Sequence, residues 1–413
     1  MANNRREFLQ SSLLAGTGGL IGTSSAANSN ASTDYSGTQV KSYRRLGRTD
    51  IKISDISMGT SRLRSGQENL VHHALDRGIN YFDSAEGYTR GQSETVLGNV
   101  LKDKREQVYL VSKTITRSNT TADRMMRDLE GSLRRLQTDY IDVYMNHAVN
   151  DTAVVGNPEW RAFTERALAQ GKIRFTGVSG HAGHLIDCLD YALDEDLVDV
   201  VLVGYNFGQD PKFYEGLISG IDRIAKQPDL PRVLGKAKQQ DVGVVAMKTL
   251  MGARLNDMRA YENAGATYSQ AAFSWVLSNP DVDALVISMT STDKIDEFLG
   301  ASGRNAVTAQ DRRLLDTYAQ LNGANYCKHA CDMCSGSCPY GVPISDVLRT
   351  RMYATDYQDV EFAQSEYALL QTNASPCLSC SGEPCAGACP NGIDIAQLCA
   401  PTHKMLGGGE RIA

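Results

Sequence analysis

Short apolar runs alternate with longer amphipathic stretches between residues 43 and 305. This alternation is expected of strand–helix units repeated around a parallel sheet. Eight such units over this length favour a closed TIM barrel, an α/β fold, over an open sheet. Helices are predicted between the strands, and the segment Tyr43–Ile53 is predicted to form a hairpin that plugs the bottom of the barrel. The predicted strands are Ile56–Met58, Tyr81–Asp83, Val108–Ser112, Ile141–Asn146, Ile173–Val178, Val198–Val203, Val242–Met247 and Ala284–Ser288.

Reactive side chains stand where three of these strands end, which is where a TIM barrel carries its chemistry. Asp83 and Tyr88 follow the second strand, Lys113 ends the third and His147 follows the fourth. A lysine beside a tyrosine is expected to stabilise the phenolate and lower its pKa, so that Tyr88 can act as a general acid or base. Asp83 would keep Lys113 charged, and His147 would polarise a carbonyl oxygen. One such residue is more often a loop salt bridge, but four at one rim predict carbonyl reduction.

Several motifs within residues 43–301 resemble the aldo-keto reductase family. They are Phe82-Asp-Ser-Ala-Glu-Gly-Tyr88 with Ser93-Glu94 and Leu97-Gly98, Leu46-Gly-Arg-Thr49, Gly59-Thr60, Gly171-Lys-Ile-Arg174 with Gly177-Val-Ser179, and Tyr205-Asn206. The resemblance implies a catalytic tetrad of Asp83, Tyr88, Lys113 and His147, with Tyr88 as the proton donor.

The same resemblance implies that NAD(P) lies across the barrel mouth, with its carboxamide near Ser179 and Asn206. Thr290 and Ser291 fall where the family often presents a basic residue to a 2′-phosphate, so the choice between NAD and NADP stays open. The glycine at position 59 can equally serve only a tight turn. The expected cofactor-binding residues are Gly59, Thr60, Ser179, Asn206, Met247, Lys248, Thr290 and Ser291.

Nine of the ten cysteines lie between Cys327 and Cys399, and eight of them form two quartets that each end in Cys-Pro. The quartets resemble the bacterial ferredoxin arrangement for one or two [4Fe-4S] clusters, with zinc or disulfides as alternatives. If the ferredoxin exchange of ligands holds, Cys338 would serve the second cluster and Cys389 the first. Residues 306–413 are therefore predicted to be a small, mostly helical iron–sulfur domain. The expected ligands are Cys327, Cys331, Cys334, Cys338, Cys377, Cys380, Cys385 and Cys389.

Two further features of this region have structural interpretations. The stretch between the quartets, residues 347–370, is predicted to be a packed helical hairpin rather than a docking face. The two remaining cysteines, Cys188 and Cys399, are expected to be small buried residues.

The amino terminus indicates export. Arg5-Arg6 precede Phe8-Leu9, an apolar run over residues 11–22 and a small-residue end, a pattern typical of a twin-arginine signal over residues 1–27. An amphipathic helix or an unstructured tail is the alternative. Residues 28–42 are predicted to be a linker, and the run is too short for a stable membrane span. We therefore expect the twin-arginine export machinery as a partner and the periplasm as the location.

The leading hypothesis is an exported oxidoreductase that transfers hydride between NAD(P) and a carbonyl or alcohol, sugars included, with Tyr88 as general acid or base. The clusters would relay electrons to a transfer partner or brace the domain. An iron–sulfur electron-transfer protein with the barrel as scaffold, and a non-catalytic carbohydrate-binding barrel, are the alternatives. The formal net charge of −6 gives no reason to expect a nucleic acid or membrane partner.

Overall fold

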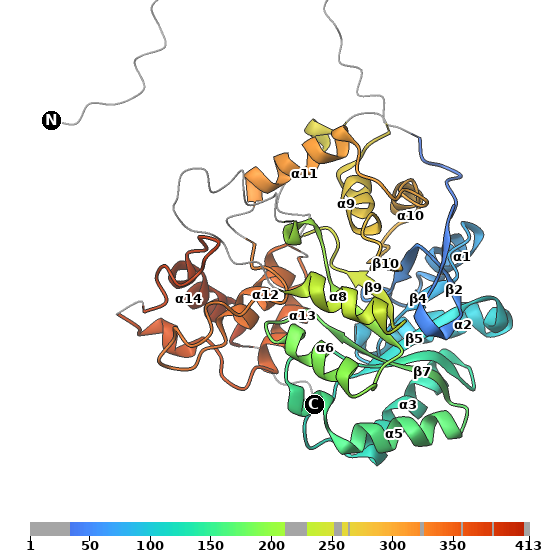
Figure 1. Ribbon diagram of the computed structural model, residues 1–413, viewed down its shortest axis with the longest axis horizontal. Helices are drawn as coiled ribbons and strands as arrows, with labels where there is room; N and C mark the ends of the chain where they lie inside the picture. Colours follow the sequence, from blue (N-terminus) through green and yellow to red (C-terminus); the bar gives the residue numbers. More distant parts are fainter. Residues whose placement is uncertain are drawn as a thin grey trace, which may run out of the picture. The chain divides into compact units, whose positions relative to one another are not determined.

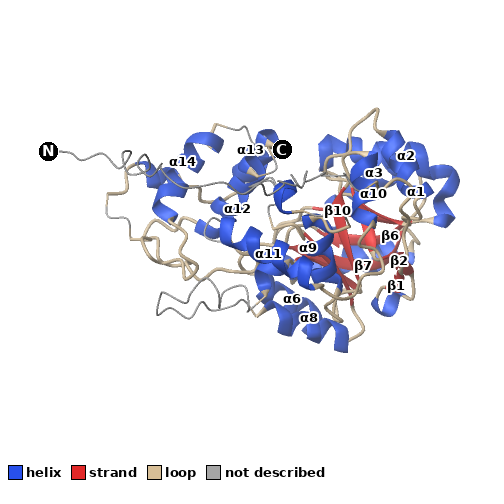
Figure 2. Ribbon diagram, turned by 90° about the horizontal axis from the view of Figure 1, so that it is seen from above, coloured by secondary structure: helices blue, strands red, loops and turns tan. Residues whose placement is uncertain are grey.

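The computed structural model describes residues 34–210, 229–251, 258–262, 265–322, 326–356, 358–381 and 384–408. Within these residues eight parallel strands close into a barrel in the order β10-β3-β4-β5-β6-β7-β8-β9, and helices surround it (Figures 1 and 2). The predicted TIM barrel is thus confirmed, and each predicted strand overlaps an observed one. The strands are β3 Ile56–Gly59, β4 Tyr81–Asp83, β5 Tyr109–Thr114, β6 Ile141–Asn146, β7 Ile173–Gly180, β8 Val200–Gly204, β9 Gly243–Met247 and β10 Ala284–Ser288.

The predicted hairpin is also present and closes the amino-terminal end of the barrel. Its strands β1 (Tyr43–Arg45) and β2 (Lys52–Ser54) pair antiparallel. Leu46 and Ile53 are fully buried and join the cluster of side chains that fills the barrel interior. A Cβ on Gly243 would lie 2.7 Å from the Leu46 side chain. Only glycine at this first position of β9 leaves room for Leu46 of the hairpin.

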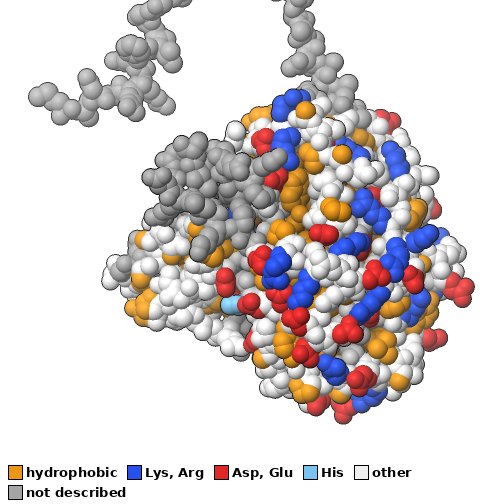
Figure 3. All heavy atoms as spheres, viewed as in Figure 1, with side chains coloured by type: hydrophobic (Ala, Val, Ile, Leu, Met, Phe, Trp, Pro, Cys, Tyr) orange, Lys and Arg blue, Asp and Glu red, His pale blue; other side chains and the backbone are white. Residues whose placement is uncertain are grey.

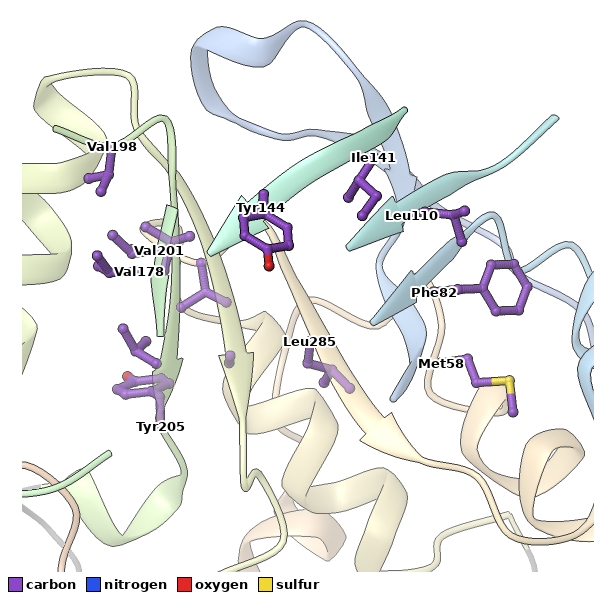
Figure 4. Close-up of a cluster of buried hydrophobic side chains, with 14 of the residues drawn as sticks. Met58, Phe82, Leu110, Ile141, Tyr144, Val178, Val198, Val201, Tyr205 and Leu285 are labelled. Carbon is purple, nitrogen blue, oxygen red and sulfur yellow. The ribbon is translucent and has the colours of Figure 1, made fainter. Parts of the chain in front are cut away.

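Side chains alternate between the barrel interior and the helix layer, as the two-residue period of a strand requires. Tyr81 and Val111 belong to the interior cluster, whereas their neighbours Phe82 and Leu110 point outward to the helices (Figure 4). The strands of a parallel barrel are buried on both faces, so each is apolar along most of its length. This is why the strand positions can be predicted from short apolar runs.

Five of the helices that cover the barrel (α3, α4, α5, α9 and α10) begin with a capping side chain. The hydroxyl of Thr121 accepts a hydrogen bond from the Arg124 amide at the start of α3, and Ser291 does the same for Lys294 at the start of α10. The covering helices are α1 Glu68–Asp76, α2 Gln92–Leu101, α3 Ala122–Leu136, α4 Thr152–Val155, α5 Pro158–Ala169, α6 Leu185–Asp194, α8 Leu230–Gln239, α9 Tyr268–Leu277 and α10 Thr292–Leu299.

The tail, residues 306–413, is helical in its described part, as predicted. It contains α11 (Ala309–Asn322), α12 (Ile344–Thr355), α13 (Val360–Ala368) and α14 (Ile395–Leu406). Helix α11 packs on α9 of the barrel, where Tyr318 stacks on Tyr268 with a centroid separation of 4.4 Å. Helices α12 and α13 pack together as the predicted hairpin. The barrel and the tail belong to one compact unit.

Two surface properties bear on partners. Figure 3 shows basic and acidic side chains interspersed over the visible face, without a large area of one sign. Among the described residues, none of the helices combines the length and the apolar character that crossing a lipid bilayer requires.

Candidate functional site

The barrel mouth, meaning the carboxyl ends of strands β3–β10, holds a buried ion pair. Asp83 ends β4 and Lys113 lies near the end of the neighbouring strand β5. The Nζ atom of Lys113 lies 2.8 Å from a carboxylate oxygen of Asp83 and donates a hydrogen bond of 2.5 Å to the carbonyl of Ser84. Because both side chains are almost fully buried, the mutual attraction of the pair is what keeps the two charges in this position.

Tyr88 and His147 lie directly above this pair. Tyr88 opens the short helix η2 (Tyr88–Gly91), and the centroid of its ring is 5.2 Å from the ammonium of Lys113. The imidazole of His147 meets the Tyr88 ring edge to face at a centroid distance of 5.6 Å. The structure therefore brings the four residues expected to be catalytic, Asp83, Tyr88, Lys113 and His147, into one site.

The electrostatics of Tyr88 differ from the expectation based on its lysine neighbour. Burial, followed by the charges of Asp83 and Glu366, raises the pKa of Tyr88 well above its usual value. The prediction that Lys113 lowers this pKa is therefore wrong, because desolvation of the phenolate is the largest effect. The phenol stays protonated at neutral pH, which suits a proton donor better than a base.

Burial also determines the protonation of the other three groups. It lowers the pKa of His147 to about 3, with the charges of Lys113 and Lys248 acting in the same direction. It raises the pKa of Asp83 and lowers that of Lys113, while the contact between these two opposes both shifts. His147 is thus neutral at physiological pH and has a ring N–H to donate.

The residues expected to bind NAD(P) also lie around the mouth. Gly59 ends β3 and pairs with Asp83 in register, and the hydroxyl of Thr60 donates to the carbonyl of Asp83. Ser179 lies at the end of β7, where its hydroxyl oxygen accepts from the Ala148 amide, so its own O–H remains to donate. Thr290 and Ser291 precede α10, Met247 ends β9, and Lys248 and Asn206 follow β9 and β8.

At Asn206 the tail takes part in the site. The Asn206 amide nitrogen donates to the carbonyl of Lys248 and to the phenol oxygen of Tyr326, both at 2.9 Å, and its oxygen accepts from the Gly208 amide. A carboxamide oxygen can therefore accept from the Ser179 O–H as the structure stands, whereas it can accept from the Asn206 nitrogen only if one of the two bonds of that nitrogen breaks.

The tail adds further polar groups to the site that could not be assigned to it from the sequence. Tyr353 of α12 accepts a hydrogen bond of 2.9 Å from Lys248. Glu366 of α13 lies close enough to influence the pKa values of Tyr88 and Lys248, and His329 packs against His181. No motif marks these residues, since the contact between Lys248 and Tyr353 joins positions 105 residues apart.

The four cysteines of the first quartet do not all line the same pocket. Cys327, Cys331 and Cys334 line a single pocket together with Cys389 from the second quartet, and Cys338 is not among its lining residues. The thiol of Cys377 is instead close enough to Cys338, Cys380 and Cys385 for their charges to affect its pKa. The fourth cysteine of each quartet thus lies with the first three of the other.

The described residues include no group of three or more cysteine, histidine or carboxylate side chains close enough together to hold a single metal ion. In a [4Fe-4S] cluster each thiolate binds a different iron, so its ligands stand farther apart than around one ion. The two remaining cysteines, Cys188 and Cys399, are buried as expected, with relative exposures of 0% and 1%.

The comparisons with known proteins agree with the barrel and its site. The model of the aldo/keto reductase family matches residues 55–260. The uncharacterized oxidoreductase YrpG of Bacillus subtilis is 26% identical over 311 residues, covering 63% of this chain and 90% of that protein. The methylglyoxal reductase YeaE of Escherichia coli is 29% identical over 250 residues, covering 57% of this chain and 81% of that protein.

Among solved structures, the holo form of the aldo-keto reductase AKR11C1 from Bacillus halodurans has a TM-score of 0.51 at 22% identity. The match covers 67% of this chain and 95% of that one. At this identity the likeness shows the fold alone. The family match, the curated relatives and the residues at the strand ends together lead to one conclusion: the chain belongs to the aldo/keto reductase family and is an oxidoreductase.

Proposed function

We propose that this protein transfers hydride between NAD(P) and a carbonyl or alcohol substrate, sugars included, with Tyr88 as the general acid or base. The observation that carries the proposal is the buried contact of Lys113 with Asp83 beneath the Tyr88 ring, with His147 packed edge to face with that ring. The similarity to a methylglyoxal reductase supports carbonyl reduction as the direction to test first.

Each of the four residues has a distinct part in reduction. Tyr88, which stays protonated, gives its proton to the substrate oxygen as negative charge develops there. Neutral His147 donates its ring N–H to the same oxygen and fixes its position. Lys113, held by Asp83, stabilises the phenolate that Tyr88 becomes, and the proton is later regained from solvent.

In reduction, NAD(P)H would supply the hydride, and the chain provides polar groups suited to holding this cofactor. The O–H of Ser179 and the amide of Asn206 would bind the carboxamide. The exposed Thr290 and the capping residue Ser291 lie at the amino-terminal end of α10, where backbone N–H groups favour a phosphate. The choice between NAD and NADP remains part of the proposal to be tested.

The tail would hold two [4Fe-4S] clusters, each with a cysteine taken from the other quartet. The pocket shared by Cys327, Cys331, Cys334 and Cys389 supports this assignment, because thiolates are the ligands that iron–sulfur clusters use. The clusters would relay electrons one at a time to a partner or brace the tail. Residues 1–27 would direct export of the folded protein by the twin-arginine machinery to the periplasm; this segment lies outside the described residues.

The proposal is tested with the mature protein purified anaerobically from the envelope of its host. Nucleotide is released by denaturation and identified by chromatography, and reduction of an aldehyde by NADH and by NADPH is followed from the loss of absorbance. Bound or used nicotinamide supports the proposal. A barrel that binds neither nucleotide and transfers no hydride would contradict it.

Electron transfer through the tail alone is the second candidate, favoured by the two mixed sets of cysteines. It predicts clusters that can be reduced and reoxidised in a protein without nucleotide. A non-catalytic carbohydrate-binding barrel instead predicts sugar binding without turnover, unaffected by Tyr88→Phe.

A further inference from the structure

Two buried imidazole nitrogens at the barrel mouth have no hydrogen-bond partner among the described residues. They are Nε2 of His329 and Nδ1 of His181. The Nδ1 atom of His329 lies 3.2 Å from the carbonyl oxygen of His181. Since a carbonyl only accepts, His329 carries its hydrogen on Nδ1, and its Nε2 is left as an acceptor. A buried polar atom without a partner is costly, so polar groups of a ligand or water belong beside these rings.

These two rings stand over the end of strand β8. A Cβ added to Gly204, the last residue of β8, would lie 2.9 Å from Cβ of His181 and 3.0 Å from Cγ of His329. Glycine at this position therefore leaves the space that the two imidazoles occupy. His181 comes from the loop after β7 and His329 from the tail, so the barrel and the tail each supply one of the rings.

The phenol of Tyr353 lies beside the same imidazoles. It accepts from Lys248 at 2.9 Å and lies 3.2 Å from Nε2 of His181, while its ring packs on Phe362 of α13. The tail thus adds a second tyrosine with a lysine and a histidine next to it, close to the site of Tyr88. Only one tyrosine is needed to protonate one carbonyl oxygen, so the second set is available to bind other atoms of the substrate.

Glu366 lies near both the catalytic Tyr88 and the group formed by Tyr353, Lys248 and His181. It lies on α13, is half-buried, and acts electrostatically on both Tyr88 and Lys248. Its negative charge balances the ammonium of Lys248, and the charge of Arg349, which also acts on both imidazoles, is balanced by its ion pair with Asp346. This cluster contains both hydrogen-bond donors and hydrogen-bond acceptors, namely an ammonium, a phenol, two imidazoles and a carboxylate. Hydroxyl groups, which donate and accept at once, match such an arrangement.

We propose that Tyr353, His181, His329 and Glu366 bind the hydroxyl groups of a polyhydroxylated carbonyl substrate, next to the carbonyl that Tyr88 and His147 hold. This assignment rests on the proposed function only for the reaction at the carbonyl. It makes the tail half of the substrate site. It also makes an unsubstituted aldehyde a poor substrate, because such a compound has no hydroxyl group to bond to Nε2 of His329 and Nδ1 of His181.

The test compares glyceraldehyde with propanal, which has the same carbon chain without the two hydroxyl groups. The measured quantity is the ratio of kcat/KM for the two aldehydes in the full-length protein. We expect wild type to prefer glyceraldehyde, and Tyr353→Phe and Glu366→Gln each to lower the ratio about fivefold, mainly through KM. The ratio is the readout because Tyr353 also contacts Lys248 and Glu366 acts on Tyr88, and any effect through these two residues changes both aldehydes alike.

Two matched variants serve as controls. Asp316→Asn changes an exposed carboxylate on α11 of the tail, and Tyr340→Phe removes a hydroxyl from a tyrosine of the tail that is 57% exposed. Both should keep the wild-type ratio. An unchanged ratio in Tyr353→Phe, or an equal loss for both aldehydes in a variant that melts like wild type, would overturn the assignment.

A binding measurement separates this assignment from the proposed function. Xylitol, a polyol without a carbonyl, should raise the melting temperature of wild type and of Tyr88→Phe but not that of Tyr353→Phe. If wild type reduces neither aldehyde and this pattern holds, the proposed hydride transfer fails and the polyol site stands. Equal effects of xylitol on all variants, or none on wild type, would reject the polyol site whatever the reductase activity.

Discussion

Lys113 and Asp83 form an ion pair of 2.8 Å in which the side chains are 0% and 5% exposed. Strand register produces this contact, since Asp83 pairs with Val111, two residues before Lys113. Taking both charges out of water is unfavourable, and the pair does not by itself indicate high stability. Its effect is positional, because it holds an ammonium under the phenol of Tyr88.

Removing one partner of this pair should destabilise the fold strongly. Lys113→Met leaves the Asp83 carboxylate buried without its counterion, and we expect the free energy of unfolding to fall by about 3–5 kcal/mol. Urea denaturation at pH 7 measures this. The double variant Asp83→Asn with Lys113→Met should regain most of the loss, and a double variant as unstable as the single one would contradict this account.

The phenol of Tyr88 should matter for turnover rather than for folding. Tyr88→Phe removes the proton donor, and we expect kcat for aldehyde reduction to fall by about 10²–10⁴-fold. The melting temperature should change little. Tyr144→Phe is the matched control, because the ring of this buried tyrosine packs on Phe163 of α5 and the variant should keep wild-type activity. Full activity in Tyr88→Phe would exclude the proposed mechanism.

The pH dependence of reduction should lack a step at the usual pKa of histidine. His147 has a pKa of about 3 and the pKa of Tyr88 is raised above its usual value, so neither group changes protonation between about pH 5 and 7. We expect kcat/KM to vary less than about twofold over this range. A limb with an apparent pKa near 6.5 that disappears in His147→Gln would show that His147 titrates normally.

Lys248 should make stability depend on alkaline pH. Burial lowers its pKa from 10.5 to about 8, so between these values the unfolded chain binds more protons than the folded one, and stability rises with pH. The free energy of unfolding of wild type should therefore increase relative to that of Lys248→Met as the pH goes from about 8 to 10. A difference that is constant or falls would contradict the lowered pKa.

The mixed cysteine sets predict which substitutions remove the same iron. Cys327→Ser combined with Cys389→Ser should lose no more iron than either substitution alone, since both affect one cluster. Cys327→Ser combined with Cys338→Ser should lose the iron of both clusters. Iron and acid-labile sulfide are measured on anaerobically purified protein. If the iron losses of Cys327→Ser and Cys389→Ser add up in the double variant, the two quartets do not exchange their fourth cysteine. Zinc in place of iron would reject the iron–sulfur clusters.

The barrel could be predicted closely because its signals are local. Apolar runs such as Ile141–Asn146 match observed strands, and the carboxyl ends of parallel strands must share one rim, so Asp83, Lys113 and His147 follow from their positions alone. The tail helices were predicted as a class, and residues 347–370 contain the expected hairpin of α12 and α13.

What the sequence could not provide is the part of the site that depends on tertiary contacts. Tyr353 and Glu366 read as ordinary residues of a helical hairpin, because nothing local shows that this hairpin meets Lys248. The pKa of Tyr88 was predicted in the wrong direction for the same reason. A neighbouring lysine is visible in the sequence, whereas the desolvation that outweighs it depends on everything packed around the ring.

The bond from Asn206 to Tyr326 has a thermodynamic consequence. Tyr326 is the residue before Cys327, so one side chain at the mouth and one cysteine of the tail pocket are adjacent in the chain. Any ligand that takes the hydrogen which Asn206 donates to Tyr326 must break this bond and thereby loosen one attachment of the cysteine loop. Linkage is reciprocal. Any binding event at the cysteines that stabilises the bond from Asn206 to Tyr326 must therefore weaken the binding of that ligand by the same free energy.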